Sequence, residues 1–277
     1  MIWQTTRFTL DLTTPRVMGI VNVTPDSFSD GDPALDAAAA IALCERLVGE
    51  GADILDIGGE STRPGAVPVP LQQEFDRIAP VVEAAVRLGV PVSVDTRHAA
   101  VMREVLALGA DIINDIQALR GDGALDVVAA DGRCGVCLMH MQGQPGAMQS
   151  NPEYGDVVGE VGAFLRERVA IVSAAGIDAA RLVVDPGIGF GKTPEHNLAL
   201  LRRQRELRAL GRPLLVGWSR KSTLGRLTGR VVGERAFAGV AAAVIALERG
   251  ASIVRVHDVA ATVDALAVWR AARPTAG

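Results

Sequence analysis

The sequence predicts an α/β protein, a single (β/α)8 barrel of the TIM type with a short N-terminal hairpin. Eight short apolar runs alternate along the chain with segments whose apolar residues recur at helical spacing. A glycine precedes most of these runs, as at Gly51, Gly89 and Gly109, and glycine tolerates the left-handed turn that ends a helix. The length of 277 residues suits one barrel of about 250 residues, so residues 1–277 are expected to form one domain.

The first expected element is the segment Phe8 to Leu12, which alternates apolar and polar residues. Alternation of this kind indicates a strand, and we expect a small hairpin that closes the bottom of the barrel. The eight barrel strands are predicted at the apolar runs, most of which stop at a polar residue or a glycine. These runs are Val17 to Val23, Ile54 to Gly58, Val92 to Asp95, Ile112 to Asp115, Val136 to His140, Leu182 to Asp185, Leu214 to Ser219 and Ile253 to Asp258.

A helical segment is predicted after each strand. Two long loops rich in Gly, Pro, Ser and Asp, Thr24 to Pro33 and Gly59 to Pro70, precede the first two helices, and loops on this side of a barrel are where substrate clamps belong. The predicted helices are Ala34 to Val48, Leu71 to Leu88, His98 to Leu108, Gly123 to Ala130, Val157 to Ala175, Glu195 to Leu210, Ser222 to Leu227 with Arg235 to Arg249, and Val259 to Ala272.

The composition argues against two classes of partner. Hydrophobic residues make up 49% of the chain, but no apolar stretch approaches the roughly 18 residues needed to cross a membrane. The net charge is -4 and the basic residues are scattered, so we expect no nucleic-acid surface. The start, Met1 to Thr14, has no charged leader followed by an apolar core, and we therefore expect a cytoplasmic protein.

Acidic and amide side chains stand at the ends of several predicted strands: Asp95, Asn114, Asp115 and Asp185. In such a barrel these groups face a common pocket, because positions lower in the barrel must pack as core. Asp185 alone could merely cap a turn, but the series favours a site. Carboxylates beside an amide suit a ligand with several N–H donors, such as a 2-amino-4-oxopyrimidine ring.

Lysine is almost absent from this chain. Among 28 lysine and arginine residues only Lys192 and Lys221 are lysines, and each lies in a loop just past a predicted strand. An ammonium is a compact donor with rotatable protons, whereas a guanidinium imposes a flat fork. We interpret the two lysines as residues that arginine could not replace, with chance placement in loops as the alternative.

A third group of residues offers donors for an anion. Asn22, the segment Ser61 to Arg63, Arg255 and His257 supply amide, hydroxyl, guanidinium and imidazole groups that can hold a phosphate or pyrophosphate. Asn22 could also bind a hard cation through its carbonyl oxygen, beside phosphate oxygens. Alternatively, Arg255 and His257 share a face of the last strand that could be core, although charged or titratable groups would be costly there.

Three other motifs are interpreted as structural. The segment Pro186 to Thr193 resembles a phosphate-binding Walker A loop, but Pro186 occupies the place of its first glycine. Cys134 and Cys137 form a C-x-x-C that lies at an apolar run and not at the start of a helix, so no redox role is expected. His140 and His196 have no companions at zinc spacing, and packing or surface roles are expected.

Seven ordered motifs together resemble the dihydropteroate synthase family. The resemblance runs from about Val17 to Trp269, and the combination is far more specific than any single motif. The motifs are Met18 to Gly31, Asp56 to Gly65, Ser93 to Thr96, Asn114 with Asp115, Asp185 to Lys192, Ser219 to Ser222, and Arg255 to Asp258.

The resemblance implies a folate-pathway transferase that joins 6-hydroxymethyl-7,8-dihydropterin pyrophosphate to p-aminobenzoate. It implies a pterin site of Asp95, Asn114, Met139, Asp185, Gly217 and Lys221. The implied pyrophosphate site consists of Asn22, Thr62, Arg63, Arg255 and His257, with Mg2+ at Asn22. The implied p-aminobenzoate pocket, where sulfonamides would compete, consists of Phe28, Thr62, Pro64, Phe190, Ser219, Arg220 and Ser222. The implied catalytic group is Asp30, Arg63, Lys221, Arg255 and His257.

The resemblance also implies a homodimer. Two alternative functions stay open, and the chain departs from the family pattern at two places. A corrinoid-dependent methyltransferase binds a pterin in a similar barrel but has no use for a pyrophosphate clamp. A non-catalytic pterin-binding homologue should have lost loop or lysine residues, and this chain retains Asp30, Arg63 and Lys221. The link Gly31 to Ala34 is shorter than the family pattern, and Trp218 is bulkier, so a changed loop closure and pocket floor are expected.

Overall fold

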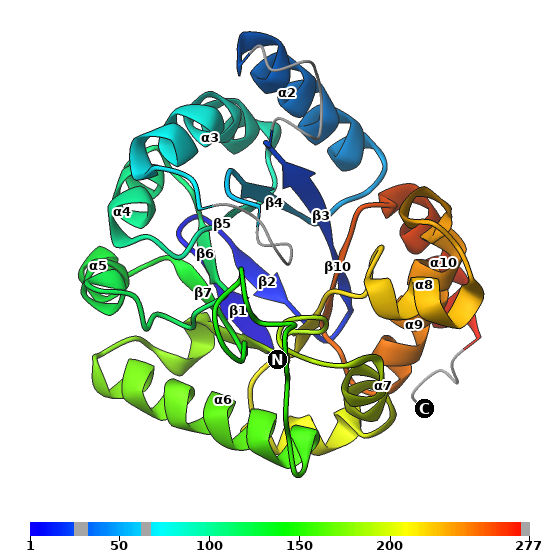
Figure 1. The fold of residues 1–277 in the computed structure, drawn as a ribbon. Helices are drawn as coiled ribbons and strands as arrows, with labels where there is room; N and C mark the ends of the chain where they lie inside the picture. Colours follow the sequence, from blue (N-terminus) through cyan, green and yellow to red (C-terminus); the bar gives the residue numbers. More distant parts are fainter. Residues whose placement is uncertain (25–32, 62–67, 273–277) are drawn as a thin grey trace.

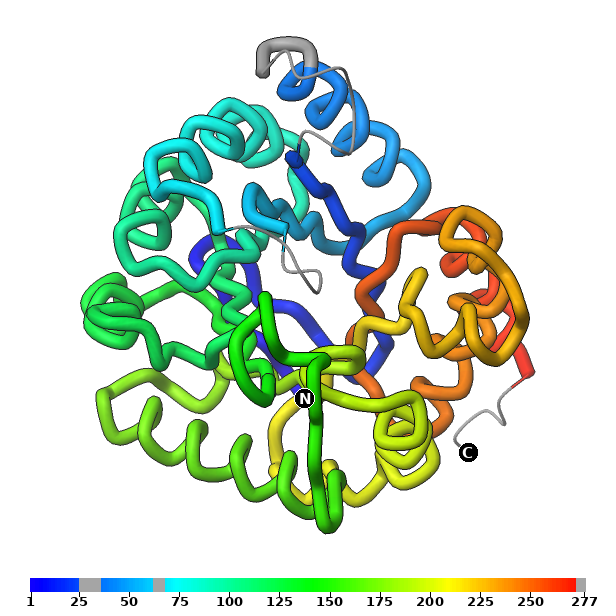
Figure 2. The backbone as a smooth tube through the Cα atoms, in the orientation of Figure 1, coloured from blue at the N-terminus to red at the C-terminus, as the bar shows by residue number. Residues whose placement is uncertain are grey.

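The computed structural model describes residues 1–24, 33–61 and 68–272. Eight parallel strands form one sheet in the order β8-β7-β6-β5-β4-β3-β10-β9, and a parallel bridge between Val184 and Leu214 joins its two edges. The helices surround the strands (Figure 1), and the chain passes round the ring in sequence order (Figure 2). This architecture is the predicted (β/α)8 barrel.

The barrel strands are short and their side chains are mostly buried. Six of the predicted strands agree with the structure to within one residue at each end, whereas the runs Leu214 to Ser219 and Ile253 to Asp258 are only partly strand. Their last residues leave the sheet and form the mouth of the barrel. The strands are β3 Arg16–Asn22, β4 Ile54–Gly58, β5 Val92–Asp95, β6 Ile112–Asp115, β7 Gly135–Met139, β8 Leu182–Asp185, β9 Leu215–Val216 and β10 Ile253–Val256.

The helices also follow the prediction closely, with two corrections. Leu71 to Leu88 is α-helical only as far as Ala85 and ends in a 3-10 turn. The segment Glu195 to Leu210 is not one helix, because α7 ends at Arg202 and a tighter 3-10 turn, η3 Gln204–Leu210, follows. The buried Gln204 side chain there donates to the carbonyl of Ala246, which ties this turn to α9. The other helices are α2 Pro33–Gly49, α3 Leu71–Ala85, α4 Ala99–Ala107, α5 Ala124–Asp131, α6 Val157–Ala174, α7 Pro194–Arg202, α8 Ser222–Thr228, α9 Ala236–Glu248 and α10 Val259–Ala271.

The glycines predicted to end helices adopt left-handed backbone conformations. Gly51, Gly89 and Gly109 have φ angles of 97°, 79° and 99°, which residues with a Cβ rarely adopt. Short 3-10 turns complete several connections, at η1 Val86–Leu88, η2 Ala179–Arg181 and η4 Val232–Glu234. Across the described ranges, none of the helices has both the length and the apolar character that a membrane span requires.

The amino-terminal hairpin closes one end of the barrel, as predicted. Strands β1 Ile2–Gln4 and β2 Thr9–Asp11 pair antiparallel. Trp3 is fully buried in the inner cluster formed by Met18, Ile54 and other strand residues, and its ring N–H donates to the carbonyl of Arg181. Beside it, Arg7 makes two side-chain hydrogen bonds to the buried carboxylate of Asp111, at 2.9 and 2.6 Å.

The two cysteines of the C-x-x-C motif have a structural role. Cys134 and Cys137 are free thiols with no exposed surface. Burial raises the pKa of Cys134 to about 12, so this thiol does not ionise near neutral pH. A buried, protonated thiol is chemically inert, which agrees with the prediction.

Candidate active site

Strands from all sides of the barrel bring polar side chains to one mouth. Asp95 on β5 is level with Gly58 on β4 and with Asn114 on β6, because these residues pair in register. Arg255 reaches the same place from β10 and contacts Asp95. Asp185 at the end of β8 and Lys221 lie close enough to each other and to Arg255 for their charges to interact. The sequence prediction of a single shared mouth therefore agrees with the geometry.

Asp56 lies at the centre of this arrangement and was missed as a site residue. Its carboxylate has no exposed surface and accepts hydrogen bonds from Ser93 at 2.6 Å, Asn114 at 3.2 Å and Arg255 at 2.5 Å. The run Ile54 to Gly58 was interpreted as an apolar strand. The sequence does contain a signal for Asp56, which is an aspartate within a buried strand. A buried carboxylate is tolerated only when other groups donate hydrogen bonds to it.

Arg255 bridges two carboxylates. Its Nε atom binds Asp56 and its Nη2 atom binds Asp95 at 2.9 Å. Burial opposes the charge of Arg255, but Asp56 and Asp95 outweigh burial and raise its pKa. Burial also raises the pKa of Asp95, because the attraction of Arg255 is offset by the neighbouring carboxylates of Asp56 and Asp115. The contact between Arg255 and Asp95 thus joins the residues predicted to bind the pterin to those predicted to bind the pyrophosphate.

Asp185 and Asp115 use their carboxylates differently. Asp185 accepts the N–H of Gly187 at 2.7 Å through one oxygen, and the other oxygen accepts no hydrogen bond from the described residues. Asp115 instead accepts from Gln117 and Leu119, both at 2.7 Å, through both oxygens. Burial raises the pKa of each to about 6. Asp115 is therefore a turn residue, which corrects the expectation that it faces the pocket.

The two lysines have different environments. Lys221 immediately precedes α8, and its Nζ atom lies 4.2 Å from the centre of the Phe190 ring. Burial and the charge of Arg255 lower the pKa of Lys221 to about 8. A Cβ at Gly189 would lie 3.1 Å from the Lys221 side chain, so the glycine allows a close approach. Lys221 thus lies beside Phe190 and Gly189 and within reach of the charges of Arg255, Asp185 and Asp95.

Lys192 holds a loop together and does not face the mouth. Its buried Nζ atom lies 2.9 Å from Nδ1 of His140 and donates to the carbonyls of Gly187 and Phe190, both at 3.0 Å. Burial and the nearby Lys192 lower the pKa of His140 to about 3, so this imidazole is neutral and can accept the bond. His140 is packed as expected, and it also fixes Lys192.

The loops after β9 and β10 meet through His257. The Ser219 hydroxyl lies 3.0 Å from Nδ1 of His257 and accepts the backbone N–H of His257 at 3.2 Å. The Arg220 guanidinium pairs with Asp258 at 3.0 Å, and Arg220 has a φ of 60°. Ser219 therefore lies next to an implied phosphate-binding residue, whereas Arg220 and the exposed Ser222 lie at the rim.

The remaining predicted residues divide into three groups. Met139 ends β7 and is buried, and Gly217 lies beside Arg255, where a Cβ would be 3.9 Å from the Arg255 side chain. Asn22 ends β3, is half-buried, and makes no side-chain hydrogen bond to the described residues. Outside the described residues lie Phe28, Asp30, Thr62, Arg63 and Pro64, and Gly31 and Asp32 of the link Gly31 to Ala34.

Trp218, which was expected to change the pocket floor, packs in the core. Only 2% of its surface is exposed, and it belongs to the main hydrophobic cluster that also contains Leu224 and Ala243. Its effect on the pocket floor stays a prediction.

Comparison with known proteins identifies the family. A family model described as pterin binding enzyme matches residues 18–257. The dihydropteroate synthase of Neisseria meningitidis serogroup B is 54% identical over 98% of this chain and 97% of its own length. A Xanthomonas albilineans dihydropteroate synthase with 4-aminobenzoic acid is 53% identical, with a TM-score of 0.90 over 96% of each chain. A Burkholderia cenocepacia dihydropteroate synthase complexed with 7,8-dihydropteroate is 51% identical, with a TM-score of 0.88 over 98% of this chain and 95% of that one. The chain therefore belongs to the dihydropteroate synthase family of pterin-binding enzymes.

Proposed function

We infer that this protein catalyses the dihydropteroate synthase reaction. The bond between the methylene carbon of 6-hydroxymethyl-7,8-dihydropterin pyrophosphate and its pyrophosphate oxygen breaks. The amino nitrogen of p-aminobenzoate bonds to that carbon and loses a proton, which gives 7,8-dihydropteroate and pyrophosphate. The observation that carries this conclusion is the meeting of Asp95, Asp185 and Lys221 at one barrel mouth, in a chain so similar to this family.

The pterin would be held by the acidic side of the mouth. Asn114 donates its amide N–H to Asp56, which leaves its amide oxygen as an acceptor for a ligand N–H. The second oxygen of Asp185 and the carboxylate of Asp95 supply further acceptors. The Lys221 ammonium would donate to the pterin carbonyl and the adjacent ring nitrogen. Met139 and Gly217 would line the ring, and Gly217 leaves room beside Arg255.

The pyrophosphate would lie on the side of the mouth formed by β3 and β10. We assign it to Asn22, Arg255 and His257 together with Thr62 and Arg63. The Asn22 amide oxygen is a hard neutral ligand at the mouth with no competing partner among the described residues, so it fits Mg2+. This ion is commonly bound by one or two protein oxygens plus substrate phosphates. When bound it would neutralise charge on the departing pyrophosphate.

The p-aminobenzoate would bind near the rim, above Lys221. Phe190 provides an aromatic wall and Ser219 a hydroxyl, while Arg220 and Ser222 lie farther out. Phe28, Thr62 and Pro64 would complete this pocket. Sulfonamides resemble p-aminobenzoate in shape and charge, so we propose that they compete for the same place.

Charge stabilisation supplies most of the catalysis in this proposal. A neutral arylamine is a modest nucleophile, so departure of pyrophosphate must carry much of the barrier. Arg63, Arg255 and His257 would stabilise the leaving group, while the electron-rich dihydropterin spreads the positive charge that develops on it. Asp30 would add a negative group near that cation. Preorganised charges in a site that excludes water are usually the largest catalytic contribution.

The two alternatives have less support. A corrinoid-dependent methyltransferase would have no need for His257 beside Ser219 and a basic group at Arg255. A non-catalytic homologue would have no reason to retain a buried ammonium at Lys221, whose desolvation is costly. We therefore favour catalysis.

We further propose a cytoplasmic homodimer in which residues 1–277 form one pterin-binding domain. The segments α8 to α10 lie next to one another (Figure 1) and carry large exposed apolar side chains, and exposed apolar surface often marks a protein interface. These side chains are Leu227, Val231, Val232, Phe237 and Val268, of which Phe237 is 88% exposed. Analytical ultracentrifugation tests the dimer.

The test of the proposed reaction is an assay for both products. Purified protein with Mg2+ and the pterin substrate should release pyrophosphate slowly, and p-aminobenzoate should accelerate the release by trapping the cation. Chromatography should then detect 7,8-dihydropteroate in amounts equal to pyrophosphate. Absence of the pteroate product from correctly folded protein would eliminate the transferase function.

A further inference from the structure

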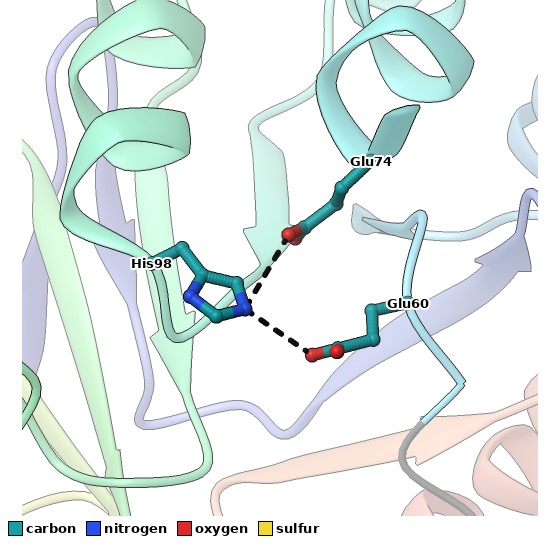
Figure 3. A group of neighbouring side chains, drawn as sticks. All are labelled: Glu60, Glu74 and His98. Carbon is teal, nitrogen blue, oxygen red and sulfur yellow. Dashed lines mark ion pairs between the residues drawn. The ribbon is translucent and has the colours of Figure 1, made fainter. Parts of the chain in front are cut away.

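Three side chains that the proposed reaction does not use converge beside the mouth. Figure 3 shows Glu60, Glu74 and His98 pointing toward one another. Glu60 lies two residues past β4, Glu74 is in the first turn of α3, and His98 immediately precedes α4. Nε2 of His98 is 3.6 Å from a Glu60 oxygen and 3.9 Å from a Glu74 oxygen. One ligand atom from each residue lies within 4.8 Å of the other two.

Glu74 is the unusual member of this cluster. Its side chain has no exposed surface, and neither carboxylate oxygen has a hydrogen-bond partner among the described residues. The Nε2 atom of His98 is likewise buried without a hydrogen bond. Burial raises the pKa of Glu74, and the nearby Thr96 hydroxyl and His98 offset this effect only in part. Buried polar groups in folded proteins are nearly always paired, so these atoms indicate a missing partner.

Glu60 is oriented toward the same point. Arg97 donates two hydrogen bonds to it, at 2.8 and 3.0 Å. Burial opposes ionisation of Glu60, but the nearby His98 and the hydrogen-bonded Arg97 outweigh burial and lower its pKa to about 2. The cluster therefore brings two carboxylates and one imidazole nitrogen to a single place. Arg97 hydrogen-bonds to only one of the two carboxylates.

The ligand chemistry selects one class of cation. Two carboxylate oxygens and an imidazole nitrogen are typical of Zn2+ and related transition ions, which often bind three protein ligands and a water molecule. Mg2+ prefers an octahedron of oxygen atoms. Ligand atoms of a tetrahedral zinc site lie about 3.3 Å apart, given bond lengths of about 2.0 Å. The distances from His98 need to shorten only by small side-chain rotations.

We propose that Glu60, Glu74 and His98 bind one divalent transition-metal ion of the Zn2+ class. This site is separate from the Mg2+ assigned to Asn22, and it goes beyond the proposed reaction. The ion would connect the exit of β4, the start of α3 and the start of α4. It would also bind the Glu74 carboxylate, whose oxygens accept no hydrogen bond from the described residues.

The test is calorimetric titration of chelator-treated protein with ZnCl2 in excess MgCl2, which occupies sites for hard cations. We expect one Zn2+ per chain. At a Zn2+ concentration about 100 times the dissociation constant, the midpoint of thermal unfolding should rise by about 5 °C or more. His98→Gln and Glu74→Gln should each weaken binding at least about tenfold. His196→Gln removes a histidine outside the cluster and should bind Zn2+ as tightly as the parent protein.

Three results would overturn the proposal. The first is the absence of stoichiometric Zn2+ binding. The second is binding that His98→Gln leaves unchanged. The third is an anomalous diffraction peak for zinc away from the three side chains. His98 is half-exposed, so its variant should fold even if Glu74→Gln does not, and circular dichroism verifies this. The product assay is independent of these outcomes, so failure here does not imply failure of the transferase function.

Discussion

Buried carboxylates at the two ends of the barrel differ in how many hydrogen bonds they accept from the protein. At the end closed by the hairpin, Asp111 accepts four hydrogen bonds, three from Arg7 and one from the backbone N–H of Val92. At the open mouth Asp56 and Asp115 are also satisfied, but among the described residues Asp185 accepts one bond, from Gly187, and Asp95 accepts one, from Arg255. The closed end satisfies its charge within the protein. The mouth keeps two carboxylates with acceptor oxygens that a ligand can satisfy.

The difference indicates that the carboxylate at the closed end contributes to stability, whereas the unsaturated carboxylates at the mouth serve ligand binding. A saturated carboxylate can contribute to the fold, whereas an unsaturated one in a buried place costs free energy until a partner arrives. Natural active sites commonly carry such a cost. The comparison predicts that equivalent substitutions at the two ends will have unequal effects on activity.

Arg255→Ala should have the largest effect. It leaves Asp56 and Asp95 without their shared cation, so we expect a loss of about 3–5 kcal/mol in the free energy of unfolding. The value of kcat/KM should fall at least about a hundredfold. Urea denaturation and the product assay measure the two quantities. Parental activity in this variant would show that the bridge between the two acids is purely structural.

Lys221→Arg should reduce kcat/KM about a hundredfold while the protein folds normally. A planar guanidinium cannot replace a compact ammonium against the Phe190 ring and the close Gly189 backbone. Steady-state kinetics and the midpoint of thermal unfolding test this. The matched control is Arg226→Lys on the exposed side of α8, which should change neither quantity. Full activity of Lys221→Arg would refute the role assigned to this lysine.

Arg7→Ala makes the corresponding change at the closed end. The Arg7 side chain is 32% exposed and the N–H of Val92 remains on Asp111, so we expect a smaller cost of about 2 kcal/mol in the free energy of unfolding. The value of kcat/KM should stay within about twofold of the parent, because only groups at the mouth develop transition-state contacts. A large loss of activity in well-folded Arg7→Ala would break the comparison.

The change of pterin affinity with pH should be smaller than the changes of kcat/KM expected for Arg255→Ala and Lys221→Arg. Burial raises the pKa of Asp185 from 3.8 to about 6. Below pH 3.8 this group contributes its full stabilisation of the native state, and the contribution is lost as the pH rises through about 6. A pterin N–H requires the ionised carboxylate, so affinity should be about tenfold weaker at pH 5 than at pH 7. Calorimetry with a pterin analogue measures this, and Asp185→Asn should flatten the profile. Stronger binding at pH 5 would contradict the assignment.

The sequence was sufficient for the barrel because the periodicity of each segment is local. The Leu214 to Ser219 run shows the limit: its composition resembles a strand, but only Leu215–Val216 pair, since the mouth and not the local pattern decides where pairing stops. The same limit applies to Glu195 to Leu210. There a buried hydrogen bond from Gln204 to α9, far along the chain, interrupts the helix.

Site residues could be predicted from the sequence where polar side chains follow the ends of strands. They could not be predicted where a residue depends on a hydrogen-bond partner that is distant in the sequence. Asp95, Asn114 and Lys221 lie at the mouth as expected. Asp56 was missed because its partner Arg255 is distant in sequence. Asp115 was misassigned because the backbone conformation that uses up its oxygens cannot be read from residue types alone.

The contacts of Lys192 explain why lysine persists in an arginine-rich chain. Its acceptors, from His140, Gly187 and Phe190, converge on a single point, so the group they enclose has to be roughly spherical. The Lys192 ammonium fits among these acceptors because it is compact, whereas the planar guanidinium of an arginine would not fit there. The shape of that enclosure therefore opposes a substitution of Lys192 by arginine.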